Sequence, residues 1–87
     1  MTRAEVDAWA DAAEIELLCA DGFDDAILGI AQRFNDYFVV YDRAKVLETL
    51  RTRDGMADEE AIEWYEFNIV GAWVGDATPA FLMTEEA

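Results

Sequence analysis

The sequence has 87 residues and a formal net charge of −14, a length that suits one folded domain over residues 1–87 and leaves no surplus for a second core. Its hydrophobic content of 54% separates it from disordered acidic tails, while its charge disfavours direct binding to nucleic acid or to an anionic membrane. Cys19 is the single cysteine and histidine is absent, which excludes an intrachain disulfide, a Ser/His or Cys/His nucleophile pair, and zinc sites that need several such ligands.

The first predicted element is a helix that starts after Thr2 and runs to Ala20. Thr2 and Glu5 have the spacing of a capping box, and the alanine-rich segment that follows favours a helix. One side of this helix is expected to face the core, with Val6, Trp9, Ala13, Leu17 and Ala20. A neighbouring side carries a row of acids that we expect to face solvent: Asp7, Asp11 and Glu14.

The next segment is predicted to be a β-hairpin. Residues 24–34 carry mixed signals, because their apolar residues fit the spacing of either a helix or a strand. We favour a strand over residues 27–34, since Asn35-Asp36 can form a tight turn and residues 37–41 are aromatic or β-branched throughout. The second strand is expected to be buried on both faces.

Two helices are predicted after the hairpin. Asp42 has the position of an N-cap for a helix over residues 43–53, whose inward side would hold Val46, Leu47 and Leu50. The last helix is predicted to start at residue 57 or 58, with acids in the first turn, where the helix dipole favours negative charge. Its inward side would hold Ile62, Tyr65, Ile69 and Trp73.

The C-terminal part of the last helix is ambiguous. Residues 67–74 are apolar apart from Asn68, so they fit either a helix inserted into the core or a separate strand. Gly75 and Pro79 are expected to end this segment, and residues 80–83 are predicted to form an edge strand. The element order α-β-β-α-α-β then predicts an α+β fold, with a small three-stranded antiparallel sheet covered by two or three helices.

Several short motifs resemble those of a widespread group of small acidic phage-encoded proteins of unassigned function. They are Asp21-Gly22-Phe23, Gln32-Arg33-Phe34-Asn35, Val40-Tyr41-Asp42, Arg53-Asp54-Gly55-Met56 and the closing EFNIVGAWVGDATPAFL. The resemblance covers most of residues 20–82 and brings no catalytic residues with it. In size, charge and implied phage origin, the chain is also similar to anti-CRISPR proteins of the type that occupies the nucleic-acid channel of a Cas effector.

Charge is segregated along the chain. Residues 54–87 carry nine acids and no base, whereas residues 33–53 hold five bases: Arg33, Arg43, Lys45, Arg51 and Arg53. On the last helix, Glu59, Glu63 and Glu66 repeat the spacing of the first acidic row, with Glu60 beside them. Carboxylates at this spacing stand about 5–6 Å apart, so each row fits either a solvated helix face or a surface that enters a basic channel. The near absence of interposed lysine favours the second interpretation.

Trp64 adds an aromatic residue beside the acids of the last helix. An exposed aromatic side chain flanked by carboxylates suits an anchor in a protein interface, a dimer contact, or simply part of the core. A generic interaction module or homodimer that uses an apolar patch near Trp64 is therefore the alternative function. A metal enzyme is a weaker competitor, based on two clusters of carboxylates: Asp21, Asp24 and Asp25, and Asp54, Asp58 and Glu59.

The sequence as a whole predicts a non-catalytic, phage-type anti-defence inhibitor. Its expected partner is a basic nucleic-acid-binding protein, with a CRISPR effector complex as the favoured candidate, and no cofactor, metal, nucleic acid or membrane is expected. We expect it to act in the cytoplasm of the bacterial host as a monomer or homodimer. The predicted partner-binding residues are Asp7, Asp11, Glu14, Glu59, Glu60, Glu63, Glu66 and Trp64.

Overall fold

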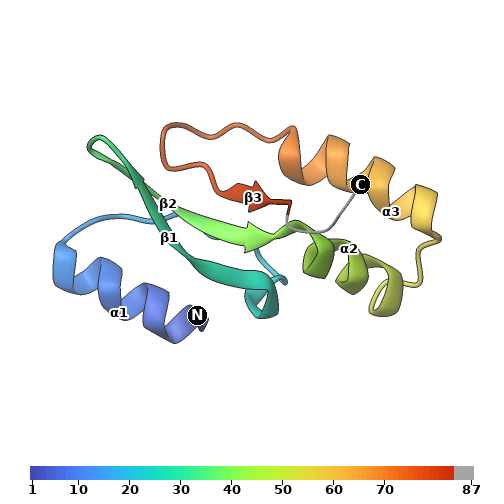
Figure 1. The fold of residues 1–87 in the computed structure, drawn as a ribbon, viewed down its shortest axis with the longest axis horizontal. Coiled ribbons are helices and arrows are strands. Elements are labelled where there is room, and N and C mark those ends of the chain that lie inside the picture. The colour runs from blue at the N-terminus through green and yellow to red at the C-terminus, as the bar shows by residue number, and fades with distance from the viewer. Residues whose placement is uncertain (84–87) are drawn as a thin grey trace.

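A computed structural model describes residues 1–83 as an α+β fold (Figure 1). Over these residues the chain forms three α-helices, a 3₁₀ turn, a π-helical turn and three strands. The order is α1 (Arg3–Ala13), a 3₁₀ turn η1 (Asp24–Ala26), β1 (Ile27–Arg33), β2 (Asp36–Asp42), α2 (Arg43–Thr52), α3 (Asp58–Tyr65), a π-helical turn η2 (Glu66–Val70) and β3 (Ala80–Leu82). The predicted element order and fold class are confirmed.

The sheet has the order β1-β2-β3 and is mixed, so the prediction of an antiparallel sheet is wrong for its third strand. β1 and β2 pair as an antiparallel hairpin, whereas β3 runs parallel to β2 with Tyr41 opposite Phe81. The physical reason is the length of the connection, because α2, α3 and the loop after them form a long crossover that lets the chain enter the sheet again in the direction of β2, beside residues 40–42. β3 lies at an edge of the sheet, as predicted.

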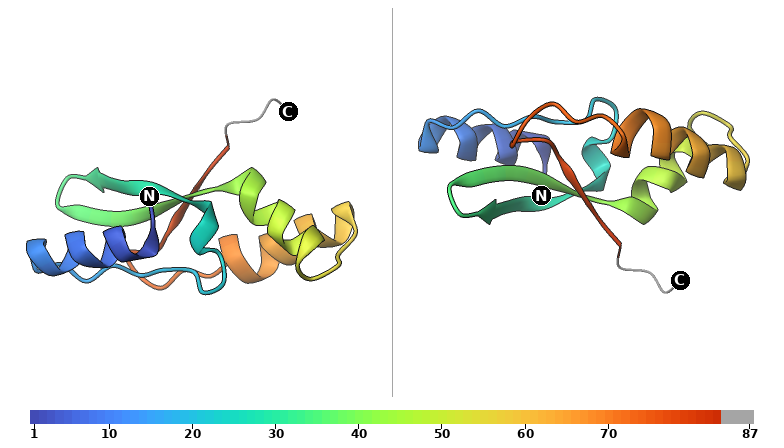
Figure 2. Two further views of the ribbon diagram at one scale, coloured as in Figure 1. Left: turned by 90° about the horizontal axis from the view of Figure 1, so that it is seen from below. Right: turned by 90° about the horizontal axis from the view of Figure 1, so that it is seen from above.

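The core is formed by residues of the sheet and of all three helices. Figure 2 shows α1 and α3 on the same side of the β1–β2 hairpin. The buried residues come from every layer: Val6 of α1, Val39 and Tyr41 of β2, Val46, Leu47 and Leu50 of α2, and Ala61 and Tyr65 of α3. The inward side predicted for α2 is therefore confirmed. In residues 1–83, no helix combines the length and the apolar character needed to cross a bilayer.

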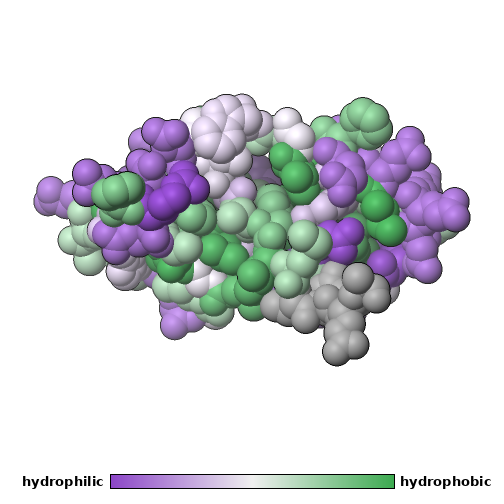
Figure 3. All heavy atoms as spheres, turned by 45° about the horizontal axis from the view of Figure 1, so that its top comes forward, coloured by the Kyte–Doolittle hydropathy of each residue, from purple (hydrophilic) through white to green (hydrophobic). Residues whose placement is uncertain are grey.

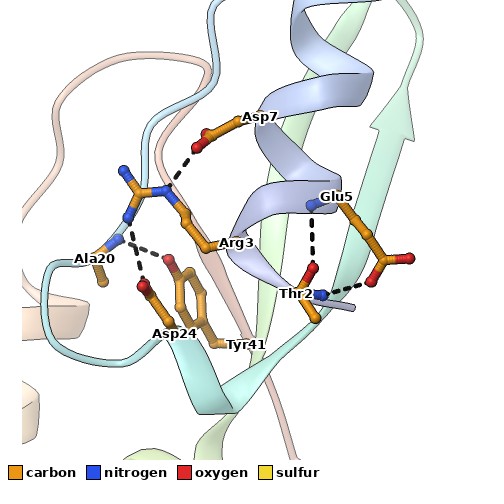
Figure 4. Close-up of polar contacts among 7 residues, drawn as sticks. All are labelled: Thr2, Arg3, Glu5, Asp7, Ala20, Asp24 and Tyr41. Atoms are coloured by element: carbon orange, nitrogen blue, oxygen red, sulfur yellow. Dashed lines mark hydrogen bonds and ion pairs between the residues drawn. The ribbon is translucent and has the colours of Figure 1, made fainter.

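The first helix is shorter than predicted. It begins with the predicted capping box at Thr2 (Figure 4) but ends at Ala13, because Glu14 adopts a left-handed conformation with φ of 57°. The apolar residues that were expected on its second half instead pack against the core from an irregular segment. One bond that fixes this segment is donated by the backbone N–H of Ala20 to the Tyr41 hydroxyl at 2.7 Å. Tertiary contacts thus override the helix propensity of residues 14–20.

The hairpin forms as predicted, but its turn is one residue earlier than expected. Arg33 pairs with Asp36, so Phe34 and Asn35 make the turn. Phe34 has a φ of 54° and is 93% exposed.

Asp42 caps α2 as predicted, since its carboxylate accepts a hydrogen bond from the backbone N–H of Ala44 at 3.1 Å.

The core-facing side of α3 differs from the prediction. Ala61 and Tyr65 are buried, and Ile69 packs against them, whereas Ile62 and Trp73 are exposed. Residues 66–70 form a π-helical turn, and the segment that follows remains on the surface. The expectation that residues 67–74 enter the core or form a strand is therefore wrong for most of the segment, in which Ile69 packs against the core and the other residues are exposed. The extra residue in a π turn rotates the following side chains away from the face that packs on β3.

Candidate functional site

The acidic row on α1 is exposed and mostly unpaired. Asp7, Asp11 and Glu14 all lie on the surface. Arg3 pairs with Asp7 at 3.4 Å and with Asp24 at 3.3 Å (Figure 4). Within residues 1–83, no basic side chain lies in ion-pair distance of Asp11 or Glu14. Two carboxylates of this row are therefore free to contact a partner.

The acidic row on α3 is larger and forms no ion pair with a base in the described part of the chain. Its members are exposed: Glu59, Glu60, Glu63 and Glu66. The Glu60 carboxylate accepts a hydrogen bond from the backbone N–H of Ala57 at 3.3 Å, which ties it to the helix start. Trp64 is 40% exposed and Phe67 is 78% exposed beside these acids. The structure therefore brings carboxylates and aromatic rings together on one surface of α3.

The bases of residues 33–53 are engaged elsewhere. Two of the guanidinium groups lie over aromatic rings, Arg33 over Phe38 and Arg43 over Tyr65. The other three bases pair with acids outside the two rows, in the pairs Lys45–Glu48, Arg51–Asp58 and Arg53–Asp54. The two rows are thus not neutralised by this basic segment.

Arg53 has a structural role that joins two of the motifs noted in the sequence. Its guanidinium donates a hydrogen bond to the carbonyl oxygen of Gly22 at 2.6 Å and lies 5.0 Å from the ring centroid of Phe23. It also hydrogen-bonds the Asp54 carboxylate, which lowers the pKa of that carboxyl below its usual value. Both glycines of these motifs have positive φ, 88° at Gly22 and 69° at Gly55, as turns of this kind require.

The predicted carboxylate clusters take part in helix and turn contacts. Asp24, Asp54 and Asp58 each pair with an arginine. Among residues 1–83, no three acidic or thiol side chains converge as metal ligands would. Glu85 and Glu86, which belong to the base-free C-terminal segment, lie outside the described residues.

The two helices that carry the acidic rows lie far apart but on the same side of the sheet (Figure 2). The molecule is elongated, with principal extents of 40 × 23 × 22 Å, and α1 and α3 lie toward opposite ends of the long axis (Figures 1 and 2). Figure 3 shows hydrophilic residues gathered at both ends of one face and hydrophobic residues across its middle. On this face, hydrophilic residues are therefore concentrated at the two ends of the molecule.

The sequence did not predict an apolar groove next to α3. The groove has a volume of about 470 Å³ and lies between the segment that follows α1 and the segment that follows η2. Leu18, Trp64, Ile69 and Val74 are among its lining residues. The signal in the sequence was the apolar run at residues 67–74, which we interpreted as buried.

Comparisons with protein-family models, with curated proteins and with solved structures found no match to this chain.

Proposed function

We propose that this protein is a non-catalytic inhibitor that binds the basic nucleic-acid-binding surface of a bacterial defence complex, with a CRISPR effector complex as the favoured partner. The observation that carries the proposal is the exposure of both acidic rows without neutralisation by the basic segment. Fixed negative charges at this spacing can replace phosphates in a basic channel and steer the protein toward it over long range.

The placement of the acids on α1 also supports a functional role. Asp11 and Glu14 lie at the C-terminal end of this helix, and its last turn carries no base. Negative charge at a helix C-terminus is unfavourable by about 0.3–1 kcal/mol per charge, because the dipole is negative there. Acids at these positions oppose helix stability, whereas those in the first turn of α3 contribute to it. Stability therefore does not explain Asp11 and Glu14 of this row.

The test reverses three charges on α3. A variant with Glu59→Lys, Glu63→Lys and Glu66→Lys should lose inhibition of a CRISPR effector, because its row would repel the basic surface. The readout is the plaquing efficiency of a CRISPR-targeted phage on cells that express each variant. The fold should persist, since all three side chains are exposed.

The matched control changes the same amount of charge outside the rows. Glu16→Lys, Asp25→Lys and Asp76→Lys replace three exposed acids that have no ion pair within residues 1–83. This control should retain most of the inhibition. Equal loss in both variants would show that net charge alone matters, and unchanged activity of the α3 variant would remove this helix from the interface.

The exposed aromatic residues favour a second candidate, a protein-interaction module or homodimer. Trp64 and Phe67 present apolar surface at one end of the molecule, where a monomer gains nothing from exposing it. Sedimentation at low and high salt separates the two functions. An apolar homodimer should persist as salt rises, whereas a complex held by charge should dissociate.

A further inference from the structure

The apolar groove has a floor of core residues and walls of exposed ones. Phe23 and Phe81 belong to the core or pack against it, and they line the groove from below. Val74 is 64% exposed on the wall that follows η2. The space of about 470 Å³ is large enough to take several aliphatic side chains. Covering it would remove apolar surface from water, which favours a bound partner.

Trp64 joins the groove to the acidic row. Its side chain lines the groove, and it also lines a shallow hollow on the surface of α3. That hollow is bordered by Phe67 and by three carboxylates: Glu59, Glu60 and Glu63. A ligand that fills the groove and extends past Trp64 therefore reaches negative charge and the faces of two aromatic rings.

We propose that the groove and the adjoining hollow bind an amphipathic basic segment of a partner protein. Apolar side chains of that segment would occupy the groove, and its lysines or arginines would contact the carboxylates beside Trp64. Charge complementarity determines this choice of occupant, because a cation gains both from these carboxylates and from the ring faces of Trp64 and Phe67. The inference rests on the proposed function in taking the partner to be basic, and it adds which surface binds and what the partner must carry.

A second copy of this chain is a poor occupant of the same surface. Each copy carries a net charge of −14. Docking a second α3 here would place carboxylates against carboxylates, which costs free energy unless bases lie between them. Within residues 1–83, the bases near α3 already contact Tyr65 or Asp58. Self-association through this groove is therefore disfavoured by charge.

The experiment uses a synthetic peptide of leucine and lysine that forms an amphipathic helix, with a scrambled peptide of the same composition as its control. Binding of both peptides to the full chain is measured by calorimetry. The decisive variant is Val74→Asp, which makes the groove polar and the protein more negative. We expect it to weaken binding of the amphipathic peptide about tenfold, because it removes an apolar contact. If charge alone attracted the peptide, Val74→Asp would instead bind it more tightly.

The matched control is Val70→Asp, which adds the same charge at an exposed position of η2 that does not line the groove. It should leave the affinity unchanged or slightly higher. Amide shifts in NMR spectra provide a second readout: peptide should shift Ala20, Asn68 and Val74, which lie at the groove, and should leave Trp9 of α1 unchanged.

Three results would overturn the inference. They are equal binding of the scrambled peptide, an affinity that does not fall in Val74→Asp, and a fall of the same size in Val70→Asp. Self-association of the chain that is lost in Val74→Asp would assign the groove to a second copy instead. None of these results decides the proposed function, which is tested separately by the lysine reversals on α3.

Discussion

The Tyr41 side chain is fully buried and joins the sheet to the segment that follows α1. Its hydroxyl accepts a hydrogen bond from the backbone N–H of Ala20 at 2.7 Å (Figure 4). Its ring stacks on Phe81. Tyr41→Phe should lower the free energy of unfolding by about 1–3 kcal/mol, because a partly buried N–H loses its acceptor. Urea denaturation measures the change. Tyr37→Phe is the control, since Tyr37 contacts Trp9 through its ring. An equal loss of stability in Tyr37→Phe would contradict the role given to the Tyr41 hydroxyl.

Titration of the Tyr41 hydroxyl should make the folding stability depend on pH in the alkaline range. Burial raises the pKa of Tyr41 to about 12 from an ordinary value of 10.0. Between these values the folded chain holds a proton that the unfolded chain has released, so folding stability falls as pH rises. Below pH 10, Tyr41 makes its full contribution to the folding stability. Denaturation at several pH values should show the fall in the natural sequence and a smaller one in Tyr41→Phe; identical curves would contradict the prediction.

At the level of elements, α1 is predicted to be weakened by its own acids. Asp11→Lys should raise the free energy of unfolding by about 0.3–1 kcal/mol, because a cation suits the helix C-terminus and can pair with Asp7 one turn earlier. Thermal unfolding followed by circular dichroism measures this gain. Asp58→Lys at the start of α3 is the opposite control and should lower stability, since it reverses a favourable charge and breaks the pair with Arg51. A loss of stability in Asp11→Lys would show that the row is structural.

The elements that the sequence predicted well are those fixed by nearby residues. Asp42 caps α2 through a neighbour two residues away, and the aromatic and β-branched run of β2 specifies a strand locally. The end of α1 was not predictable in this way. Residues 14–20 have helix-forming composition, yet the hydrogen bond from Ala20 to Tyr41 joins positions that are 21 residues apart. The parallel direction of β3 likewise depends on how the whole crossover packs.

The candidate site also contains features that nearby residues determine and features that depend on distant contacts. The seven acidic site residues were predicted to be exposed, and all seven are. For Trp64 the sequence left both an interface and the core open, and the side chain is 40% exposed. The apolar groove could not be predicted, because it depends on a π-helical turn that leaves Val74 on the surface and on an irregular segment that places Leu18 opposite. Hydrophobicity alone indicated burial for residues 67–74. Their exposure is what makes this end of the molecule suitable for a partner.

At the scale of the whole molecule, the charge distribution predicts opposite effects of salt on folding and on binding. The screening length is about 30 Å at 0.01 M salt and about 10 Å at 0.1 M. Repulsion between the acidic ends of a molecule 40 Å long is therefore largely screened by 0.1 M salt, whereas repulsion between neighbours in one row, about 5–6 Å apart, is screened less. Tm should rise as salt increases over this range and then level off.

Binding to a basic partner should weaken over the same range, because salt screens the attraction that brings the two surfaces together. Scanning calorimetry gives Tm, and the amphipathic lysine peptide gives the affinity in matched buffers. The variant with Glu59→Lys, Glu63→Lys and Glu66→Lys should show a smaller rise of Tm with salt, since its net charge is lower. A Tm that falls with added salt would mean that the five ion pairs within residues 1–83 outweigh the repulsion of the rows. The acidic ends would then be stabilised within the molecule, and a basic partner would have less to gain from binding them.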